Sequence, residues 1–339
     1  MARPPRRAAA VATLLLAPAI AAATPSIDLP SPWRAGLRLE YASESRIDAT
    51  DATGARERTR VADTTTISVV RAAPGVVQDW TARNAVFEVL EGDPARAATQ
   101  RATMAALDGF VLRLTVDGDR NVHLDNLDAL AERLRPVARQ AMTRQAEAAL
   151  AKMPEAEREA ARARLPSRVD AVLAQATAPE ALDPVIGRQP RAYLAYVGVS
   201  LEPRRRVVRD IDLPLPDGGT VPAKLTTQLL HDPAHRNHAI VLWRATIDPE
   251  RGAQAAWALA QRLAGAPLAA GAGLPGELVV EDAGFVLIDR RDGVVELFEN
   301  TRKVGYGAAI KVERQRMRLT SGSHDHAWTD APSREMVRE

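Results

Sequence analysis

A short sequence pattern occurs twice in this chain of 339 residues and constrains its fold more than any other feature. Residues 109–112 and residues 284–287 both read Gly-Phe-Val-Leu. An Asp-Gly pair follows eight residues after each glycine, at 117–118 and at 292–293. Apolar strand residues that lead into an Asp-Gly pair are typical of a β-hairpin. The pattern therefore predicts a similar hairpin in each half of the chain.

A second match lies upstream of each hairpin. Residues 93–98 and 248–253 both begin with Asp-Pro, which suits the start of a helix because aspartate can cap the first turn and proline fits the first helical position. A β-rich stretch with a tryptophan, Trp80 or Trp243, precedes each match. Short strand–turn patterns can coincide by chance, but two matches in the same order favour duplication of a strand–strand–helix–strand–strand unit.

The fold class that we expect is α+β, with two similar antiparallel β-rich lobes joined by a helical segment. Apolar residues at intervals of three and four between Leu127 and Ala141 indicate the helical segment. We expect Pro136, Pro154 and Pro166 to break or kink its helices. The expected segments are a signal peptide (1–23), lobe 1 (24–126), the helical segment (127–190), lobe 2 (191–320) and a polar, loosely ordered tail (321–339).

Both lobes carry the alternation of apolar and polar residues that is typical of strands. In lobe 1, Leu37, Leu39 and Tyr41 alternate with polar or small residues. In lobe 2 a helix is expected at 249–264. The strands that we expect in lobe 2 are residues 192–201, 206–213, 220–230, 238–247, 285–289, 294–298 and 308–319.

The N-terminus has the three parts of a secretory signal peptide. Arginines at positions 3, 6 and 7 precede the apolar residues 8–20, and three alanines follow, so we expect cleavage between Ala23 and Thr24. A retained membrane anchor is the weaker alternative, because the apolar stretch is shorter than the roughly 20 residues that span a bilayer. The Arg6–Arg7 pair leaves both the general and the twin-arginine export routes open.

Charge and cysteine content define the expected compartment. The chain has 45 Lys and Arg against 43 Asp and Glu, and loss of residues 1–23 leaves 42 bases and 43 acids. We therefore expect no nucleic-acid partner. No later stretch predicts a transmembrane helix. The chain has no cysteine, which excludes disulfides and thiolate chemistry and fits a periplasmic or secreted bacterial protein.

A histidine cluster is the one candidate metal site. His231, His235 and His238 lie within eight residues, together with Asp232, and imidazole is a good ligand for zinc or copper. Spacing of this kind gathers ligands on a helix, but Pro233 places the cluster in an expected hairpin loop. A polar loop tip is therefore the preferred interpretation, and a metal site is the alternative. A second group, residues 324–326, lies in the expected tail and is a weaker candidate.

The residues around the other motifs argue against a binding site at each of them. Residues 117–121 resemble the start of a calcium loop, but Val122 stands where such a loop needs glycine, so we expect a β-turn there. Residues 271–276 have the Gly-x-Gly-x-x-Gly spacing between an expected helix and an expected strand, which is the wrong order for a dinucleotide site. The basic run 204–209 suits a solvated strand edge. No catalytic residue and no cofactor are predicted.

We therefore expect a non-catalytic periplasmic protein whose β-rich lobes bind an apolar or envelope-derived ligand, or another envelope protein. Sheets of this kind bury one face and can enclose an apolar groove. An exported metal-dependent hydrolase that uses His231, His235 and His238 is the alternative. A purely structural envelope protein is a third interpretation, which differs from the first only in its partners.

Overall fold

The computed structural model describes residues 26–92, 94–215, 219–230, 236–264 and 278–320. The expected signal peptide, the expected tail and the glycine-rich residues 271–276 lie outside these ranges. Within them, the chain is rich in strands and carries helices as well, which confirms an α+β composition with a large antiparallel sheet. None of the described helices is both long enough and apolar enough to cross a membrane.

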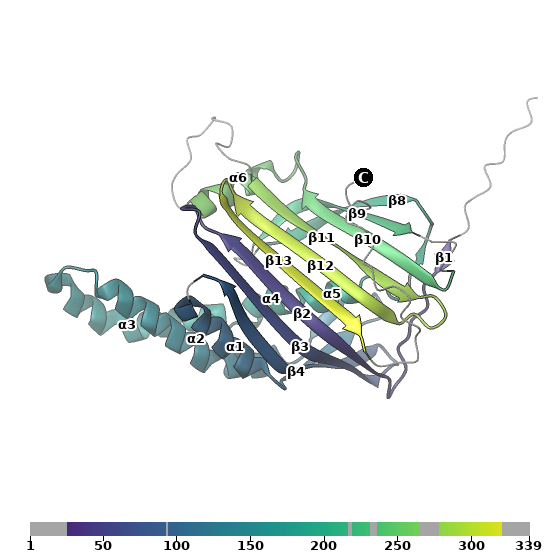
Figure 1. The fold of residues 1–339 in the computed structure, drawn as a ribbon, viewed down its shortest axis with the longest axis horizontal. Coiled ribbons are helices and arrows are strands. Elements are labelled where there is room, and N and C mark those ends of the chain that lie inside the picture. Colours follow the sequence, from purple (N-terminus) through teal and green to yellow (C-terminus); the bar gives the residue numbers. More distant parts are fainter. Residues whose placement is uncertain (1–25, 93, 216–218, 231–235, 265–277, 321–339) are drawn as a thin grey trace, which may run out of the picture.

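Eleven strands form one antiparallel sheet, with the three-residue β6 at one edge and the nine-residue β8 at the other (Figure 1 shows the sheet). The order along the chain differs from the order in the sheet, because β13 returns to the centre and pairs with β2. From one edge to the other, the strands are β6 (Val122–Leu124), β5 (Val111–Val116), β4 (Val76–Glu91), β3 (Arg56–Arg71), β2 (Arg38–Thr50), β13 (Ala309–Leu319), β12 (Val295–Tyr306), β11 (Leu278–Asp289), β10 (His238–Ile247), β9 (Thr220–Leu230) and β8 (Arg206–Pro214).

Helices lie on one face of this sheet and beyond its edge. In Figure 1, α4 and α5 lie behind the sheet, and α2 and α3 extend as a helical pair past β4. Two short strands, β1 (Ile27–Asp28) and β7 (Ser200–Leu201), pair with each other outside the main sheet. The helices are α1 (Pro94–Leu107), α2 (Leu127–Leu150), α3 (Glu155–Ala176), α4 (Pro179–Ile186), α5 (Arg188–Leu194) and α6 (Ala253–Ala264).

The core lies between the sheet and α5, and aromatic rings form its centre. The ring centroid of Tyr193 lies 5.2 Å from that of Trp80 on β4, 5.9 Å from that of Tyr41 on β2 and 6.0 Å from that of Phe298 on β12. One side chain of α5 thus contacts strands that are four positions apart in the sheet. In a flat sheet, with neighbouring strands about 4.8 Å apart, β4 and β12 would be too far apart for one tyrosine ring to contact both. The sheet therefore curves around α5.

The strands of both expected lobes lie in this single sheet. β2 and β13 pair without interruption from Ile310 opposite Thr50 to Leu319 opposite Tyr41, so no sheet edge separates the halves. Each half contains four neighbouring strands with a helix between the second and the third: β3, β4, α1, β5, β6 and β9, β10, α6, β11, β12. This order agrees with the expected unit, while duplication itself stays a prediction.

The two copies of Gly-Phe-Val-Leu occupy different positions. Gly109 precedes β5 in a left-handed conformation with φ +70°, and a Cβ atom there would meet nothing within 4 Å. Gly284 lies inside β11, where a Cβ atom would come within 2.5 Å of the Trp243 ring. One glycine is favoured by backbone conformation and the other by close packing. The matching letters therefore do not have matching structural roles.

Two expectations about secondary structure are wrong. Residues 192–201, expected as a strand, form the end of α5, a turn and the two-residue β7. Burial of Tyr193 and Val197, four residues apart, explains the difference because this spacing puts both side chains on one side of a helical turn. The break expected at Pro166 is also absent, since α3 runs through it, and no new helix begins at Pro136 inside α2. Of the three prolines, Pro154 is the one that lies at a helix boundary, where it precedes α3.

Candidate functional site: a cavity beside the helices

A cavity of about 480 Å³ lies between the sheet and the helices α1, α2, α4 and α5. Strands β2, β3, β4 and β13 form one wall, and α1 forms much of the opposite wall. Its lining residues are mainly apolar or small. They include Ile47, Val61, Trp80, Ala82, Phe87, Met104, Leu107, Phe110, Leu112, Leu130, Val185, Ile186 and Pro190.

Trp80 joins the cavity to the aromatic core. Its indole N–H donates to Oε1 of Gln78 at 2.9 Å, so the buried ring has its hydrogen-bond donor satisfied. The same ring contacts Tyr193 edge-on, with the two planes at 88°. Because the contacts with Tyr193 and Gln78 fix the Trp80 ring, the ring forms an ordered apolar part of the cavity wall.

Asp63 is the one ionisable residue in the described lining of the cavity. It lies on the inner face of β3, opposite Ser43 of β2. Its Oδ1 accepts a hydrogen bond of 2.8 Å from Thr65 Oγ1, and Ser43 Oγ donates to that same hydroxyl at 2.8 Å. Burial raises the pKa of the Asp63 carboxyl, although the hydrogen bonds from Thr65 and Ser43 lower it in part.

Two glutamine side chains add acceptors to the lining. Gln100 on α1 donates through Nε2 to Glu57 Oε1 at 3.3 Å, which leaves its own Oε1 buried without a hydrogen-bond partner in the described part of the chain. Gln315 on β13 also buries an Oε1 without such a partner. A buried amide oxygen without a hydrogen bond is uncommon and costs free energy. Gln100 and Gln315 therefore bring amide groups to the cavity wall, with these two oxygens themselves buried.

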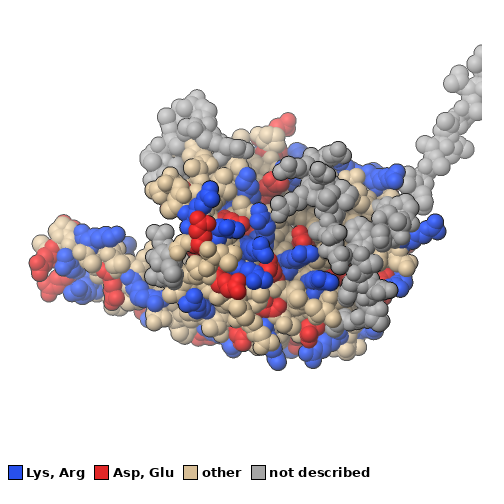
Figure 2. Space-filling model, in the orientation of Figure 1, with Lys and Arg blue, Asp and Glu red and all other residues tan. Residues whose placement is uncertain are grey.

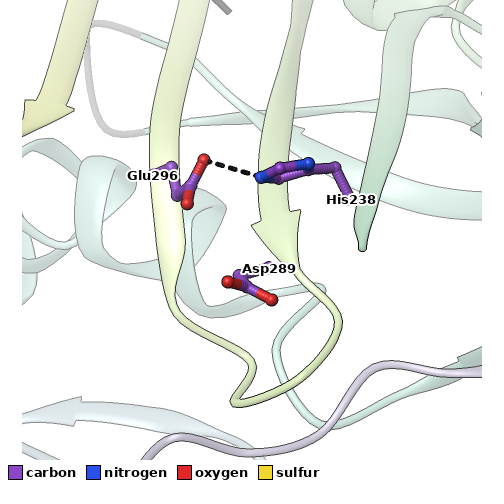
Figure 3. A group of neighbouring side chains, drawn as sticks. All are labelled: His238, Asp289 and Glu296. Carbon is purple, nitrogen blue, oxygen red and sulfur yellow. Dashed lines mark ion pairs between the residues drawn. The ribbon is translucent and has the colours of Figure 1, made fainter. Parts of the chain in front are cut away.

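His238 belongs to a second group of polar side chains, at one end of β10, β11 and β12 (Figure 3). It lies 3.2 Å from Glu296, measured from Nε2 to Oε2, and is directly opposite Asp289 in the pairing of β10 with β11. One potential ligand atom from each of the three residues lies within 4.8 Å of the others. His231 and His235, the other two histidines of the predicted metal site, lie outside the described residues.

Asp289 is engaged by the turn that follows it. Its carboxylate accepts hydrogen bonds from the backbone N–H of Arg291 at 2.9 Å and from the guanidinium of Arg291. A metal ion bound by Asp289 would have to compete with this guanidinium. At the strand ends, Asp289 therefore pairs with the Arg291 guanidinium, and the His238 ring lies beside the Glu296 carboxylate.

The sequence pattern predicted His238 as a possible metal ligand, but it did not predict the two carboxylates that lie beside it. Asp289 and Glu296 are 51 and 58 residues further along the chain, and nothing in their spacing points to His238. The sequence feature that could have indicated them is their position, one on each side of the predicted Asp292–Gly293 turn. Only the register of β10 against β11 places the histidine beside them.

The other motifs have structural roles. The predicted β-turn after β5 is confirmed, because the Arg120 N–H donates to the Asp117 carbonyl at 3.0 Å. Hydrogen bonds from Asn121, and a further one from His123, hold the pKa of Asp117 at about 2. The arginine run 204–209 leads into β8, which is an edge strand as predicted. Residues 324–326 lie outside the described part.

The opposite face of the sheet carries charges of both signs, interspersed rather than gathered (Figure 2). Arg60 of β3 bridges Glu44 at 2.7 Å and Glu88 at 3.1 Å across three neighbouring strands. Arg244 likewise bridges to Glu281 at 2.7 Å. Cross-strand pairs of this kind favour the sheet only slightly, and the described charges visible on this face are of both signs.

Neither a protein-family model nor a curated protein matches the sequence. A solved structure described as "Lipid-protein interactions in lipovitellin" is similar, with a TM-score of 0.41 and 8% sequence identity. The match covers 88% of this chain and 27% of that one, so this chain spans about a quarter of its length. Likeness at this level says nothing about what the present chain binds.

Proposed function

We propose that this protein is an exported, non-catalytic binding protein of the bacterial cell envelope that holds an apolar ligand in the cavity beside Trp80. The observation that carries the proposal is the cavity itself, with about 480 Å³ and a mainly apolar lining. Sites for small molecules have volumes of about 300–1,000 Å³, apolar walls and a few polar groups. A partly open, mainly apolar hollow of this size favours a binding role.

The lining favours binding over catalysis. Acyl transfer or hydrolysis needs a nucleophile or an activated water, a base beside it and donors for the developing negative charge. Asp63 is the single ionisable side chain in the described lining, and its neighbours are hydroxyls and amides. A single carboxylate can orient a ligand. It cannot by itself supply the nucleophile, the base and the donors that acyl transfer or hydrolysis requires.

The expected export of the chain supports an envelope role. The N-terminal sequence has the pattern of a signal peptide, the chain has no cysteine, and loss of residues 1–23 brings it close to neutrality. A carrier or receptor for an apolar molecule is useful in the periplasm because such a molecule dissolves poorly between the two membranes. Periplasmic localisation is part of the proposal.

We also propose that the two halves of the sheet derive from one duplicated unit. The shared order of four strands and one helix in each half supports this, and so does the Asp-Gly turn in the hairpins β5–β6 and β11–β12. The different roles of Gly109 and Gly284 weaken it. A comparison of related sequences that aligned the two halves across many chains would test it.

A metal-dependent hydrolase remains the alternative, with one observation in its favour and one against it. The gathering of His238, Asp289 and Glu296 favours a metal site. The guanidinium of Arg291 on Asp289 opposes it. This group also lies at a distance from the cavity in the sheet, since none of its members lines the cavity.

The proposed function is tested by isolating the protein from the periplasm of its own organism under mild conditions. Native mass spectrometry is expected to show a bound small molecule, and organic extraction is expected to release it. Titration of the extracted protein with N-phenyl-1-naphthylamine, which fluoresces in apolar surroundings, is expected to show saturable binding. Protein without a bound species and without saturable uptake of this probe would overturn the proposal.

A further inference from the structure

The acceptors on the sheet wall of the cavity, from Asp63 and Gln315, form one patch. Asp63 of β3 pairs with Ser43 of β2, and Ser43 pairs on its other side with Met317 of β13. Two residues along, Ser45 of β2 pairs with Gln315 of β13. Asp63, Ser45 and Gln315 all line the cavity. The carboxylate and the amide oxygen of Gln315 therefore lie on neighbouring rows of one sheet face.

This patch has negative charge without a matching cation. No lysine, arginine or histidine belongs to the described lining. In the described structure the hydroxyls of Thr65 and Ser43 lower the pKa of the Asp63 carboxyl, and the charged residue that shifts this pKa is another acid, Asp108, which raises it. A carboxylate that is half-buried beside apolar walls is stabilised by a nearby positive charge or by hydrogen-bond donors.

The wall opposite this patch supplies a further acceptor. Gln100 belongs to α1 and lines the cavity. Its Nε2 donates to Glu57, which fixes the orientation of the amide, and its buried Oε1 has no hydrogen-bond partner in the described part of the chain. Gln100 Oε1, Gln315 Oε1 and the Asp63 carboxylate all accept hydrogen bonds. Apolar side chains complete the cavity, with Phe87 and Phe110 among them.

From this arrangement we infer that the ligand is an amphiphile whose polar end carries a protonated amine, which pairs with Asp63, and whose apolar body lies against Trp80, Phe87 and Phe110. The inference rests on the proposed function, since it names the class of ligand for the same cavity. An ammonium group has three donors and no acceptor, so it can pair with the carboxylate and donate its other hydrogens to hydroxyl or amide oxygens of the lining. An anionic head group would instead meet the like charge of Asp63.

Three ligands with the same chain length test the inference: decylamine, decan-1-ol and decanoate. Each displaces N-phenyl-1-naphthylamine from the wild-type protein, the Asp63→Asn variant and the Asp79→Asn variant at pH 7.4. Asparagine keeps an acceptor for Thr65 and removes the charge. Asp79 is the matched control because it lies on the outer face of β4, where it pairs with Arg113 at 2.8 Å.

Decylamine is expected to bind wild type at least tenfold more tightly than decan-1-ol or decanoate. Asp63→Asn is expected to weaken decylamine at least tenfold and to leave decan-1-ol and the probe within twofold, which also shows that the cavity remains folded. Asp79→Asn is expected to leave all three ligands within twofold. Equal binding of the three ligands, tighter binding of decanoate, or an amine preference that survives Asp63→Asn would overturn the inference and leave the proposed function standing. Absence of binding by the probe and by all three ligands would overturn both.

Discussion

The hydroxyl oxygens of Tyr41 and Tyr193 lie 2.7 Å apart at the centre of the core, and both rings are fully buried. Tyr41 donates its one hydroxyl proton to the carbonyl of Val295 at 2.9 Å. Tyr193 must therefore be the donor in the bond between the two tyrosines. This chain of hydrogen bonds joins α5 to β2 and to the start of β12. It holds the helix in the position that closes the apolar core beside the cavity.

The direction of these hydrogen bonds predicts unequal effects of two substitutions. Tyr193→Phe removes a donor and leaves Tyr41 bonded to Val295, so we expect a loss of about 1 kcal/mol in the free energy of unfolding. Tyr41→Phe leaves the buried Tyr193 proton without its acceptor and removes the bond to Val295, so we expect about 2 kcal/mol. Urea denaturation measures both. Equal losses, or a larger loss for Tyr193→Phe, would contradict the assigned direction.

Glu313 predicts a contribution to stability that depends on pH. Arg188 lies 2.7 Å and Lys311 2.6 Å from its carboxylate. Burial alone would raise the pKa of Glu313, but the charges and hydrogen bonds of these two cations lower it to about 2 from an ordinary value of 4.5. A lowered pKa in the folded state stabilises the protein above the unfolded value, and this stabilisation is lost as the pH falls from about 4.5 towards 2.

We therefore expect Glu313→Gln to cost stability at pH 6 and less at pH 3. The difference in unfolding free energy between wild type and variant should shrink by about 2 kcal/mol over that interval, which follows from 1.5 pH units below 4.5. Urea denaturation at each pH provides the measurement. Glu132→Gln on α2, whose carboxylate is 69% exposed, is the control and should show little change. A constant difference for Glu313→Gln would argue against the two ion pairs.

The contacts of His238, Asp289 and Glu296 predict that the folded protein holds no metal ion there and does not need one for its stability. Because Arg291 engages Asp289, we expect the isolated protein to contain less than one zinc, copper or manganese ion per ten chains. We also expect EDTA to leave the melting temperature unchanged within 1 °C, since no folding energy would come from a bound ion. Elemental analysis and a thermal scan measure these two quantities. One ion per chain, together with a chelator-sensitive melting temperature, would instead support the hydrolase alternative.

The N-terminal sequence predicts processing on export. When the full chain is expressed in a bacterium with a periplasm, we expect the exported protein to begin at Thr24 and to lack residues 1–23. Edman sequencing or intact mass of the periplasmic fraction measures this. Replacement of Ala21 and Ala23 by arginine should block cleavage. Protein that keeps Met1 and remains in the cytoplasm would remove the support for an envelope role.

Local patterns predicted the strands and turns well where local and tertiary preferences agree. Residues 238–247 were predicted as a strand with the bounds that β10 has, because aliphatic residues fill a strand buried on both faces. The segment with Tyr193 and Val197 was misread because both residues favour strands, while burial under the curved sheet selects a helical turn.

The candidate site could be predicted only in part, because its residues are brought together by pairing across the whole chain. An apolar groove was expected from antiparallel sheets, but its location was not. Ser45 and Gln315 are 270 residues apart and become neighbours only when β13 pairs with β2. Nothing in the local sequence around Asp63 marks it as a cavity residue, since a single acid in a strand usually faces solvent.

Ligand uptake by a blocked cavity tests the central claim most directly. Thr103 lines the cavity from α1, whereas Ala105 on the same helix is exposed. Thr103→Trp should fill part of the cavity and weaken the binding of N-phenyl-1-naphthylamine at least tenfold, with a circular dichroism spectrum like that of wild type. Ala105→Trp should leave the affinity within twofold. Equal affinity of wild type and both folded variants would contradict binding in this cavity.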